Sequence, residues 1–389
     1  MKNSAEILKS IRDCGLLRVL NPAQAAGARI FRDGQNFVNF ACNDYLGISA
    51  DIDLQQEFLK LLVDEKCDFI MSSVSSRLLG GDNFAFENFE NFLSQIYSKA
   101  CSAPKKTLLF NCGYHANTGV LSALATSKDL IIADRLSHAS IIDCLKLTDA
   151  KWLRFKHNDY DNLRDILKKN RGNFENVFIA TESVFSMDGD RADIQALADI
   201  KREFDALLYV DEAHGVGLYG SNGLGLAQSQ NQLQNVDFLM CTLGKALASA
   251  GAFLVCGDDV RQILINKCRT FIFTTAMAPI NVLWSEFIFK KMMAMSARRE
   301  HLAVISKLLR KSLTGLNTLG DSQIVPVILG ENSIANAVSE KLFDAKIWAP
   351  AVRYPSVPKG QARLRLSLNA DMSTDLICDC AAKILEVAQ

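Results

Sequence analysis

Short apolar runs recur through the middle of the chain, and each is followed by a turn and then by a helical spacing of apolar positions. Strands that are apolar throughout, rather than at alternate positions, are typical of a mostly parallel sheet with helices on both faces. The pattern therefore predicts a large α/β domain over residues 46–275. Its strands are TLLFN at 107–111, LIIA at 130–133, VFIAT at 177–181, LLYV at 207–210 and FLMC at 238–241.

The pattern changes after Pro279, where helical spacing dominates and strands become short. This change predicts a smaller C-terminal α+β domain over residues 276–389, and leaves residues 1–45 as an N-terminal segment. The predicted elements of the smaller domain are helices over 280–316 with an interruption near Ala297, a strand over 324–329, a helix over 333–344, a strand over 363–368 and a terminal helix.

Composition narrows the possible partners. Of 389 residues, 49% are hydrophobic and 22% are charged, as in ordinary soluble globular proteins. Lysine plus arginine and aspartate plus glutamate both number 43, so we expect neither a nucleic acid nor a membrane as partner, although a local patch could dock an acidic carrier protein. No apolar stretch reaches the roughly 20 residues of a spanning helix, and the first residues lack the pattern of a secretory signal.

The eleven cysteines are scattered, and their odd number does not favour a fully paired disulfide framework. No pair of cysteines or histidines has the spacing of a zinc site, so no metal is predicted. We therefore expect reduced cysteines, most of them small core residues, and a cytoplasmic location.

Chemically distinctive residues follow the last two apolar runs, and ligands of open parallel sheets bind beyond the carboxyl ends of strands. LLYV leads into Asp211, with His214 three residues further, and FLMC leads through TLG to Lys245. A desolvated lysine attacks carbonyl groups readily. A lysine and a carboxylate on two strands suit pyridoxal phosphate (PLP), because the lysine forms a Schiff base and the carboxylate keeps the pyridine nitrogen protonated.

Each of these residues alone has a simpler interpretation. Asp211 could be part of a turn or cap a helix, His214 could be a structural histidine, and Lys245 could be an ordinary surface lysine. Their joint placement at successive strand ends favours the cofactor site.

Two further segments suit a phosphate group. At 111–115 a strand ends and a helix begins, so backbone N–H groups point toward any bound anion and Gly113 allows close backbone approach; a plain strand–helix turn is the alternative. At 272–275 the hydroxyls of Thr274 and Thr275 precede a helix predicted to begin near Ala276, where simple capping by Thr275 is the alternative.

Two more strand ends carry polar residues. His138 follows LIIA, where it either caps a helix or stacks on a planar cofactor. Ser186 follows VFIAT, ahead of an Asp-Gly turn, and is placed to reach a ring hydroxyl.

Several longer motifs resemble those of the α-oxoamine synthases, fold-type-I PLP enzymes that join an amino acid to an acyl-CoA with loss of carbon dioxide. The resemblance extends from about residue 31 to the C-terminus. The motifs are ACNDYLG at 41–47, DRLSHAS at 134–140, ESVFSMDGD at 182–190, DEAHGVG at 211–217, TLGKA at 242–246 and VPKGQARLRLSL at 357–368.

The resemblance implies a role for each candidate residue. Lys245 would form the Schiff base, Asp211 would pair with the pyridine nitrogen, and His138 would stack on the ring. Asn43 and Arg365 would bind the substrate carboxylate, for which a guanidinium fork is well shaped. The remaining implied contacts are Ser186 and His214 to the ring hydroxyl, Gly113, Tyr114 and Thr242 to the phosphate, and Thr274 or Thr275 to the phosphate across a homodimer interface.

Arg363 lies two residues from Arg365 and therefore faces the same side of a strand, so the choice between them depends on the resemblance. The alternative for Arg365 is a strand residue that pairs with a surface acid.

Within the family, the motifs are most similar to those of members that use L-alanine and a pimeloyl thioester, carried on coenzyme A or on a carrier protein. VPKGQAR is also close to members that use glycine and acetyl-CoA. The segment MSSVSSRLLGG at 71–81 departs from the family, which has a glycine-rich run there, near the expected acyl substrate.

Two other functional classes fit the sequence less well. A nicotinamide dehydrogenase would require G-x-G-x-x-G after an early strand, and the glycines from Gly217 to Gly225 do not have that spacing. A non-catalytic scaffold with a relict site is disfavoured because Lys245, Asp211 and His138 are all present.

Overall fold

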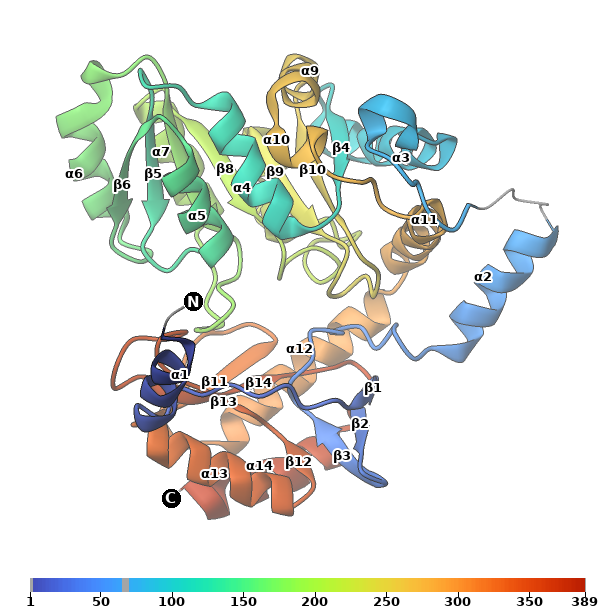
Figure 1. Ribbon diagram of the computed structural model, residues 1–389, viewed down its shortest axis with the longest axis vertical. Helices are drawn as coiled ribbons and strands as arrows, with labels where there is room; N and C mark the ends of the chain where they lie inside the picture. The colour runs from blue at the N-terminus through green and yellow to red at the C-terminus, as the bar shows by residue number, and fades with distance from the viewer. Residues whose placement is uncertain (1–2, 65–69, 389) are drawn as a thin grey trace. The chain divides into compact units, whose positions relative to one another are not determined.

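The computed structural model describes residues 3–64 and 70–388 (Figure 1). They divide into two compact units, a larger one of Asp51–Ser186 and Asp190–Arg299, and a smaller one of Met1–Ala50, Met187–Gly189 and Glu300–Gln389. This division differs from the predicted boundaries at 45/46 and 275/276. Residues 276–299 group with the larger unit because helix α11 (Pro279–Met293) packs against α3 (Phe84–Cys101), where the rings of Phe289 and Phe89 meet.

A seven-stranded sheet forms the centre of the larger unit. Strand β10 is antiparallel to both its neighbours, and the other described pairs are parallel. The predicted α/β fold with a mostly parallel sheet is therefore confirmed. In spatial order the strands are β4 (Lys106–Phe110), β10 (Ala252–Cys256), β9 (Phe238–Thr242), β8 (Leu207–Asp211), β7 (Val177–Glu182), β5 (Leu130–Asp134) and β6 (Lys151–Phe155).

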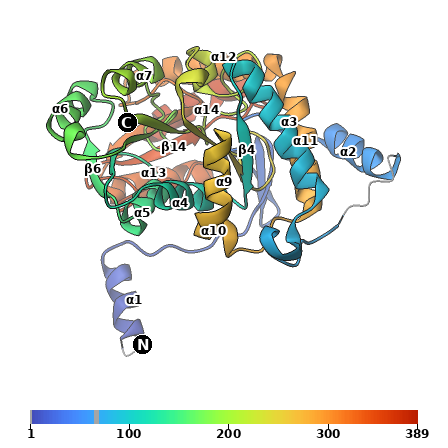
Figure 2. The same cartoon turned by 90° about the horizontal axis from the view of Figure 1, so that it is seen from above.

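Helices cover both faces of this sheet (Figure 2), which is why its inner strands are buried along their whole length. One face carries α4 (Gly113–Leu124), α5 (Ala139–Leu147), α9 (Asp258–Lys267) and α10 (Arg269–Ile272). The other carries α3, α6 (Tyr160–Asn170) and α7 (Ile194–Glu203). The unit also contains α2 (Ile52–Asp64), α8 (Leu226–Ser229), the π-helical turn η1 (Arg77–Gly81) and the 3₁₀ turns η2 (Arg171–Asn173) and η3 (Leu233–Asn235).

Two helix starts bear on the site. His138 caps α5, because its ring nitrogen accepts a hydrogen bond from the backbone N–H of Ser140. The prediction of a helix near Ala276 was wrong, since α11 begins at Pro279, whose fixed φ suits the first helical position, and Ala278 is its N-cap. Thr275 therefore caps no helix.

The smaller unit is built from both ends of the chain. Strand β3 (Gln35–Asn39) pairs in parallel with β12 (Ile347–Trp348), next to the hairpin of β1 (Gln24–Ala26) and β2 (Arg29–Arg32). A second sheet has the order β11 (Ile324–Gly330), β14 (Ala362–Ser367) and β13 (Ala351–Val352). Its helices are α1 (Ser4–Asp13), α13 (Asn332–Asp344) and α14 (Thr374–Ala388), while α12 (Ser296–Ser312) spans the boundary between the units. Among the described helices, none is long and apolar enough to cross a membrane.

Candidate active site

A cavity of about 180 Å³ lies in the larger unit, where β7, β8 and β9 end. Seven of the residues singled out in the sequence line this cavity. They are Gly113, Tyr114, His138, Asp211, His214, Thr242 and Lys245, joined by Asn117, Ser140, Glu182, Ala213 and Met240, which were not predicted as site residues.

Lys245 lies in the connection between β9 and the antiparallel β10, and its Nζ is 2.8 Å from Nε2 of His214. The connection is held by its own backbone, because the carbonyl of Lys245 accepts from the N–H of Ala248, and Ser249 N–H donates to Leu243. The lysine amine is thus presented from a loop that is anchored at both ends in one sheet.

Asp211 ends β8 and is almost completely buried. Its Oδ1 accepts from the backbone N–H of Ala213 at 2.7 Å, and its Oδ2 accepts from Nδ2 of Asn117 at 2.8 Å. The Asn117 amide also donates to Ser140 Oγ at 2.8 Å and accepts from the Tyr209 hydroxyl at 2.6 Å. This network fixes the carboxylate in the orientation that faces the cavity.

The spacing of Asn117 in the sequence could have predicted its place at the cavity. It stands four residues after Gly113, and residues with that spacing share one face of a helix. The helix that presents its first N–H groups to the cavity therefore also presents this amide.

Glu182 is a second carboxylate at the cavity, at the end of β7 and directly opposite Asp211 in the parallel pair. Burial and the neighbouring Asp211 raise the pKa of Glu182 well above its usual value, which favours the neutral acid. Its Oε1 accepts from the backbone N–H of His138 and so holds that residue in place.

His138 lines the cavity and is also the helix cap that the sequence left as an alternative. Its Nδ1 lies 2.7 Å from Ser140 Oγ. Burial lowers the pKa of His138, Asp211 opposes this shift, and Lys245 reinforces it. The lowered pKa favours a neutral imidazole, which suits stacking on a planar ring better than a desolvated cation does.

The N-terminus of α4 is suited to bind an anion. The N–H groups of Gly113 and Tyr114 lie in the first helical turn, where helix geometry supplies no acceptor. A Cβ at Gly113 would be in van der Waals contact with Cε of Met240 at 3.5 Å and Cβ of Thr242 at 3.8 Å, so it would fill space beside two residues that line the cavity. The Tyr114 hydroxyl donates to Asp143, which leaves only the backbone of Tyr114 for an anion.

The Thr242 hydroxyl, at the end of β9, donates to the carbonyl of Gly251 at 3.2 Å and accepts from Gly244 N–H at 3.3 Å. A buried acid, an amine, a neutral imidazole and a helix start around one cavity fit the ring and phosphate of PLP.

Three predicted cofactor residues lie elsewhere in the larger unit. Thr274 and Thr275 adjoin Asn111, whose amide donates to Thr274 Oγ1 at 3.3 Å and to the Thr275 carbonyl at 2.6 Å. Ser186 follows β7 and is half-buried. None of the three lines the cavity of this single chain.

The smaller unit brings Asn43 and Arg365 together. An Arg365 amino group lies 3.1 Å from Asn43 Oδ1 and 3.4 Å from the Tyr45 hydroxyl, and its other amino group donates to Ser367 at 2.7 Å. By contrast, the buried Arg363 pairs with Asp188 and donates to the carbonyl of Met187. Arg363 is therefore committed to structure.

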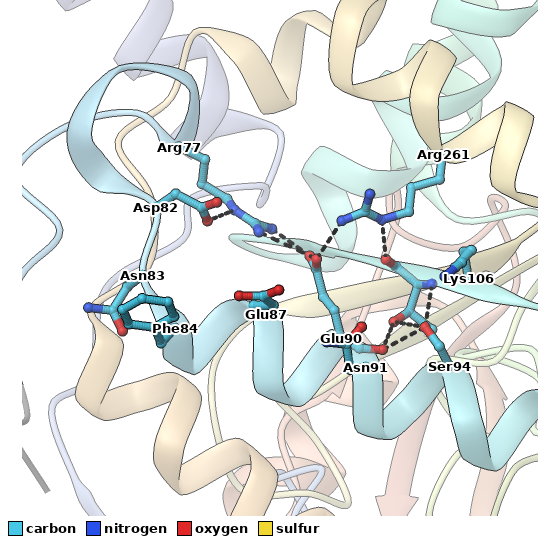
Figure 3. Close-up of a pocket in the computed structure, with 11 residues that line it drawn as sticks. Arg77, Asp82, Asn83, Phe84, Glu87, Glu90, Asn91, Ser94, Lys106 and Arg261 are labelled. Carbon is cyan, nitrogen blue, oxygen red and sulfur yellow. Dashed lines mark hydrogen bonds and ion pairs between the residues drawn. The ribbon is translucent and has the colours of Figure 1, made fainter.

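A larger cavity, of about 570 Å³, lies beside α3, β4 and α9 (Figure 3). Its wall contains Glu90 between Arg77 at 2.5 Å and Arg261 at 2.9 Å, and Glu90 also accepts from the backbone N–H of Leu109. The two ion pairs join η1, α3 and α9, and the hydrogen bond to Leu109 adds β4, so we assign the Glu90 cluster to structure.

In the segment that departs from the family, Val74 has a φ of 50° and Gly81 has no room for a Cβ, which would lie 2.1 Å from the Ser75 carbonyl oxygen. Val74 therefore occupies the left-handed region that glycine tolerates and β-branched residues avoid.

Known proteins resemble this chain both in sequence and in fold. The sequence profile of the family described as aminotransferase class I and II matches residues 35–384. The chain is 44% identical to a putative 8-amino-7-oxononanoate synthase of Haemophilus influenzae, covering 90% of this chain and 91% of the relative. It is also 44% identical to the 8-amino-7-oxononanoate synthase of Chlorobaculum parvum, covering 90% of this chain and 89% of that protein.

Among solved structures, serine palmitoyltransferase from S. paucimobilis with a bound PLP-myriocin aldimine matches with a TM-score of 0.89 and 26% identity, covering 99% of this chain and 97% of that chain. The 8-amino-7-oxononanoate synthase from Francisella tularensis matches with a TM-score of 0.74 and 28% identity, covering 90% and 97%. These similarities confirm PLP as the cofactor and exclude the nicotinamide alternative. The chain belongs to the aminotransferase class I and II family and, within it, to the PLP-dependent α-oxoamine synthases.

Proposed function

We propose that this PLP-dependent acyltransferase condenses L-alanine with a pimeloyl thioester, with loss of carbon dioxide, to give 8-amino-7-oxononanoate for biotin biosynthesis. The observation that carries the proposal is the 44% identity, over nine-tenths of the chain, to relatives with that name. The arrangement of Lys245, Asp211 and His138 at one cavity supports the same chemistry.

Bound PLP supplies an electron sink for the electrons left at the substrate α-carbon. Lys245 would hold the cofactor through its Nζ at rest. Once the amine of L-alanine takes its place, the freed Nζ would remove the α-proton and return a proton after carbon dioxide is lost. Asp211, oriented by Asn117, keeps a proton on the pyridine nitrogen. His138 would stack on the ring, and His214, with Ser186 from the loop after β7, would contact its hydroxyl.

Gly113, Tyr114 and Thr242 would hold the phosphate, together with Thr274 or Thr275 of a second copy of the chain. The position of both threonines beside Asn111, away from the cavity-lining set of their own chain, supports this sharing. We therefore propose a homodimer.

Asn43 and Arg365 bind the carboxylate of L-alanine. An Arg365 amino group lies 3.1 Å from Asn43 Oδ1, so one carboxylate can be reached by both side chains, and the guanidinium fork matches a carboxylate in two contacts. The ten described cysteines are all free thiols, which supports a cytoplasmic location.

A second candidate is glycine C-acetyltransferase, which is favoured only by the motif VPKGQAR. The deciding experiment measures thiol release by the PLP-loaded protein with L-alanine plus pimeloyl-CoA and with glycine plus acetyl-CoA. Release with the first pair alone supports the proposal and shows that coenzyme A suffices as acyl carrier. Release with the second pair alone would overturn the substrate assignment. Pimeloyl carrier protein in place of pimeloyl-CoA tests the other donor.

A further inference from the structure

His157 lies just beyond the edge strand β6, outside the cavity, between two carboxylates. Its Nδ1 is 2.9 Å from Oδ1 of Asp134, and its Nε2 is 2.7 Å from Oδ2 of Asp190. An ionised carboxylate only accepts hydrogen bonds, so both ring nitrogens must donate and the imidazole must carry a positive charge.

Both carboxylates also accept hydrogen bonds from neighbouring N–H groups. Asp134 accepts from the backbone N–H groups of Leu136 at 2.8 Å and Asn158 at 3.0 Å, and Asp190 accepts from the Asn158 amide at 2.7 Å. Burial alone would lower the pKa of His157, but the hydrogen bonds to Asp134 and Asp190 outweigh it and raise this pKa to about 10.

The two carboxylates belong to loops that carry cofactor residues. Asp134 ends β5, and its hydrogen bond to Leu136 shapes the turn that leads to His138. Asp190 closes the segment that contains Ser186, where its carbonyl accepts from the N–H of Phe185 at 3.0 Å.

The ring of Phe185, next to Ser186 in sequence, lies edge-on against the ring of His157 with centroids 4.4 Å apart. One imidazole therefore contacts the ends of both loops.

We propose that His157 is a positioning residue of the PLP site, whose charged imidazole fixes the loops of His138 and Ser186 relative to each other. The inference deepens the proposed function, because it rests on the roles proposed for those two residues. A role in general stability alone would affect unfolding but leave the cofactor's affinity and orientation unchanged.

The test compares the wild type with His157→Gln, which keeps a polar side chain but cannot become charged. The matched control is His301→Gln, in the smaller unit, where Nε2 of His301 contacts the carbonyl of Met372 at 2.8 Å. Three properties are measured for each protein: the Kd of the apoprotein for PLP, the visible circular dichroism of bound PLP, and the Tm of the apoprotein.

We expect His157→Gln to raise the Kd for PLP by about tenfold, the effect of a lost charged hydrogen bond, and to change the visible circular dichroism. His301→Gln should leave both unchanged. A lower Tm for His157→Gln with wild-type Kd and circular dichroism would overturn the proposal.

Asp190→Asn covers the case in which His157→Gln fails to fold, because it removes one charged contact and keeps the imidazole. It should also weaken PLP binding, and the double variant should be no weaker than the worse single variant. Wild-type PLP binding by Asp190→Asn would overturn the proposal as well. PLP binding is measured without substrate, so an error in the proposed substrates leaves these results unaffected.

Discussion

At the scale of single residues, the hydrogen bonds around Asp211 show how one amide links a charged group to the core. Asn117 donates to Asp211 and Ser140 and accepts from Tyr209, and all four side chains are buried. Each of these groups would be left without that partner if the amide were removed, and a buried unpaired polar group costs about 1–3 kcal/mol.

Asn117→Ala should therefore lower the free energy of unfolding by about 2 kcal/mol and weaken PLP binding, because Asp211 loses its orienting donor. Chemical denaturation and PLP titration measure the two effects. The double variant with Tyr209→Phe should lose less than the sum of the single variants, since the orphaned hydroxyl is gone. Strict additivity would contradict this account.

Lys245→Ala should abolish turnover and the absorbance band of lysine-bound PLP, because no other residue is proposed to hold the cofactor covalently. Lys267→Ala, on the exposed surface of α9, is the control and should leave both unchanged. A variant at Lys245 that keeps the band would exclude this residue as the anchor.

The sequence was sufficient to place Lys245, Asp211 and His138 at one cavity, because the carboxyl ends of parallel strands meet at one sheet edge. Glu182 was missed although it ends an apolar run in the same way as Asp211. Thr274 and Thr275 show what strand order cannot predict, since loop positions depend on tertiary contacts such as the one with Asn111.

At the scale of elements, Glu90 joins η1, α3, β4 and α9 through Arg77, Leu109 and Arg261. Glu90→Gln should lower the free energy of unfolding by about 3 kcal/mol, because two largely buried guanidinium groups lose their common counter-ion. Urea unfolding measures the change. Glu87→Gln, on the exposed side of the same helix, is the matched control and should change the free energy of unfolding by less than about 0.5 kcal/mol. Equal effects of the two substitutions would show that the cluster contributes little.

The parallel strands β4, β5, β7, β8 and β9 were predicted because they are apolar at almost every position. Strand β6 was missed because it lies at the sheet edge and its sequence, KWLRF, has two charged residues out of five and is largely exposed. Strand β10 was missed for a different reason. Its residues continue an apolar stretch after Lys245, and periodicity alone gives no sign of a reversal in direction.

At the scale of the whole molecule, stability should depend on pH through Glu212, which is fully buried and accepts from Ala227 N–H at 2.8 Å. Burial raises the pKa of Glu212 from 4.5 to about 7. A raised acid pKa means that the folded state holds its proton more tightly than the unfolded state. This contribution to stability is complete below pH 4.5 and is lost as the pH rises to 7.

Glu212→Gln should remove this pH dependence, which amounts to roughly 3 kcal/mol between the two pKa values. The variant should be at least as stable as the wild type at pH 8, where the wild type buries a carboxylate. Urea unfolding of both proteins from pH 5 to 8 gives the difference between their free energies of unfolding at each pH. The contributions of other titrating groups cancel in this difference. Parallel pH profiles would contradict the prediction.

The insertion of β10 between β4 and β9 also has a consequence for how the protein is made. Phe110 of β4 pairs with Ala252 of β10, and in the smaller unit Val38 pairs with Ile347. Synthesis proceeds from the N-terminus, so each of these early strands is made long before the downstream strand with which it pairs. A nascent chain that stops before β10 leaves β4 without that partner and with an unpaired edge, which is where foreign strands add and where chaperones are needed.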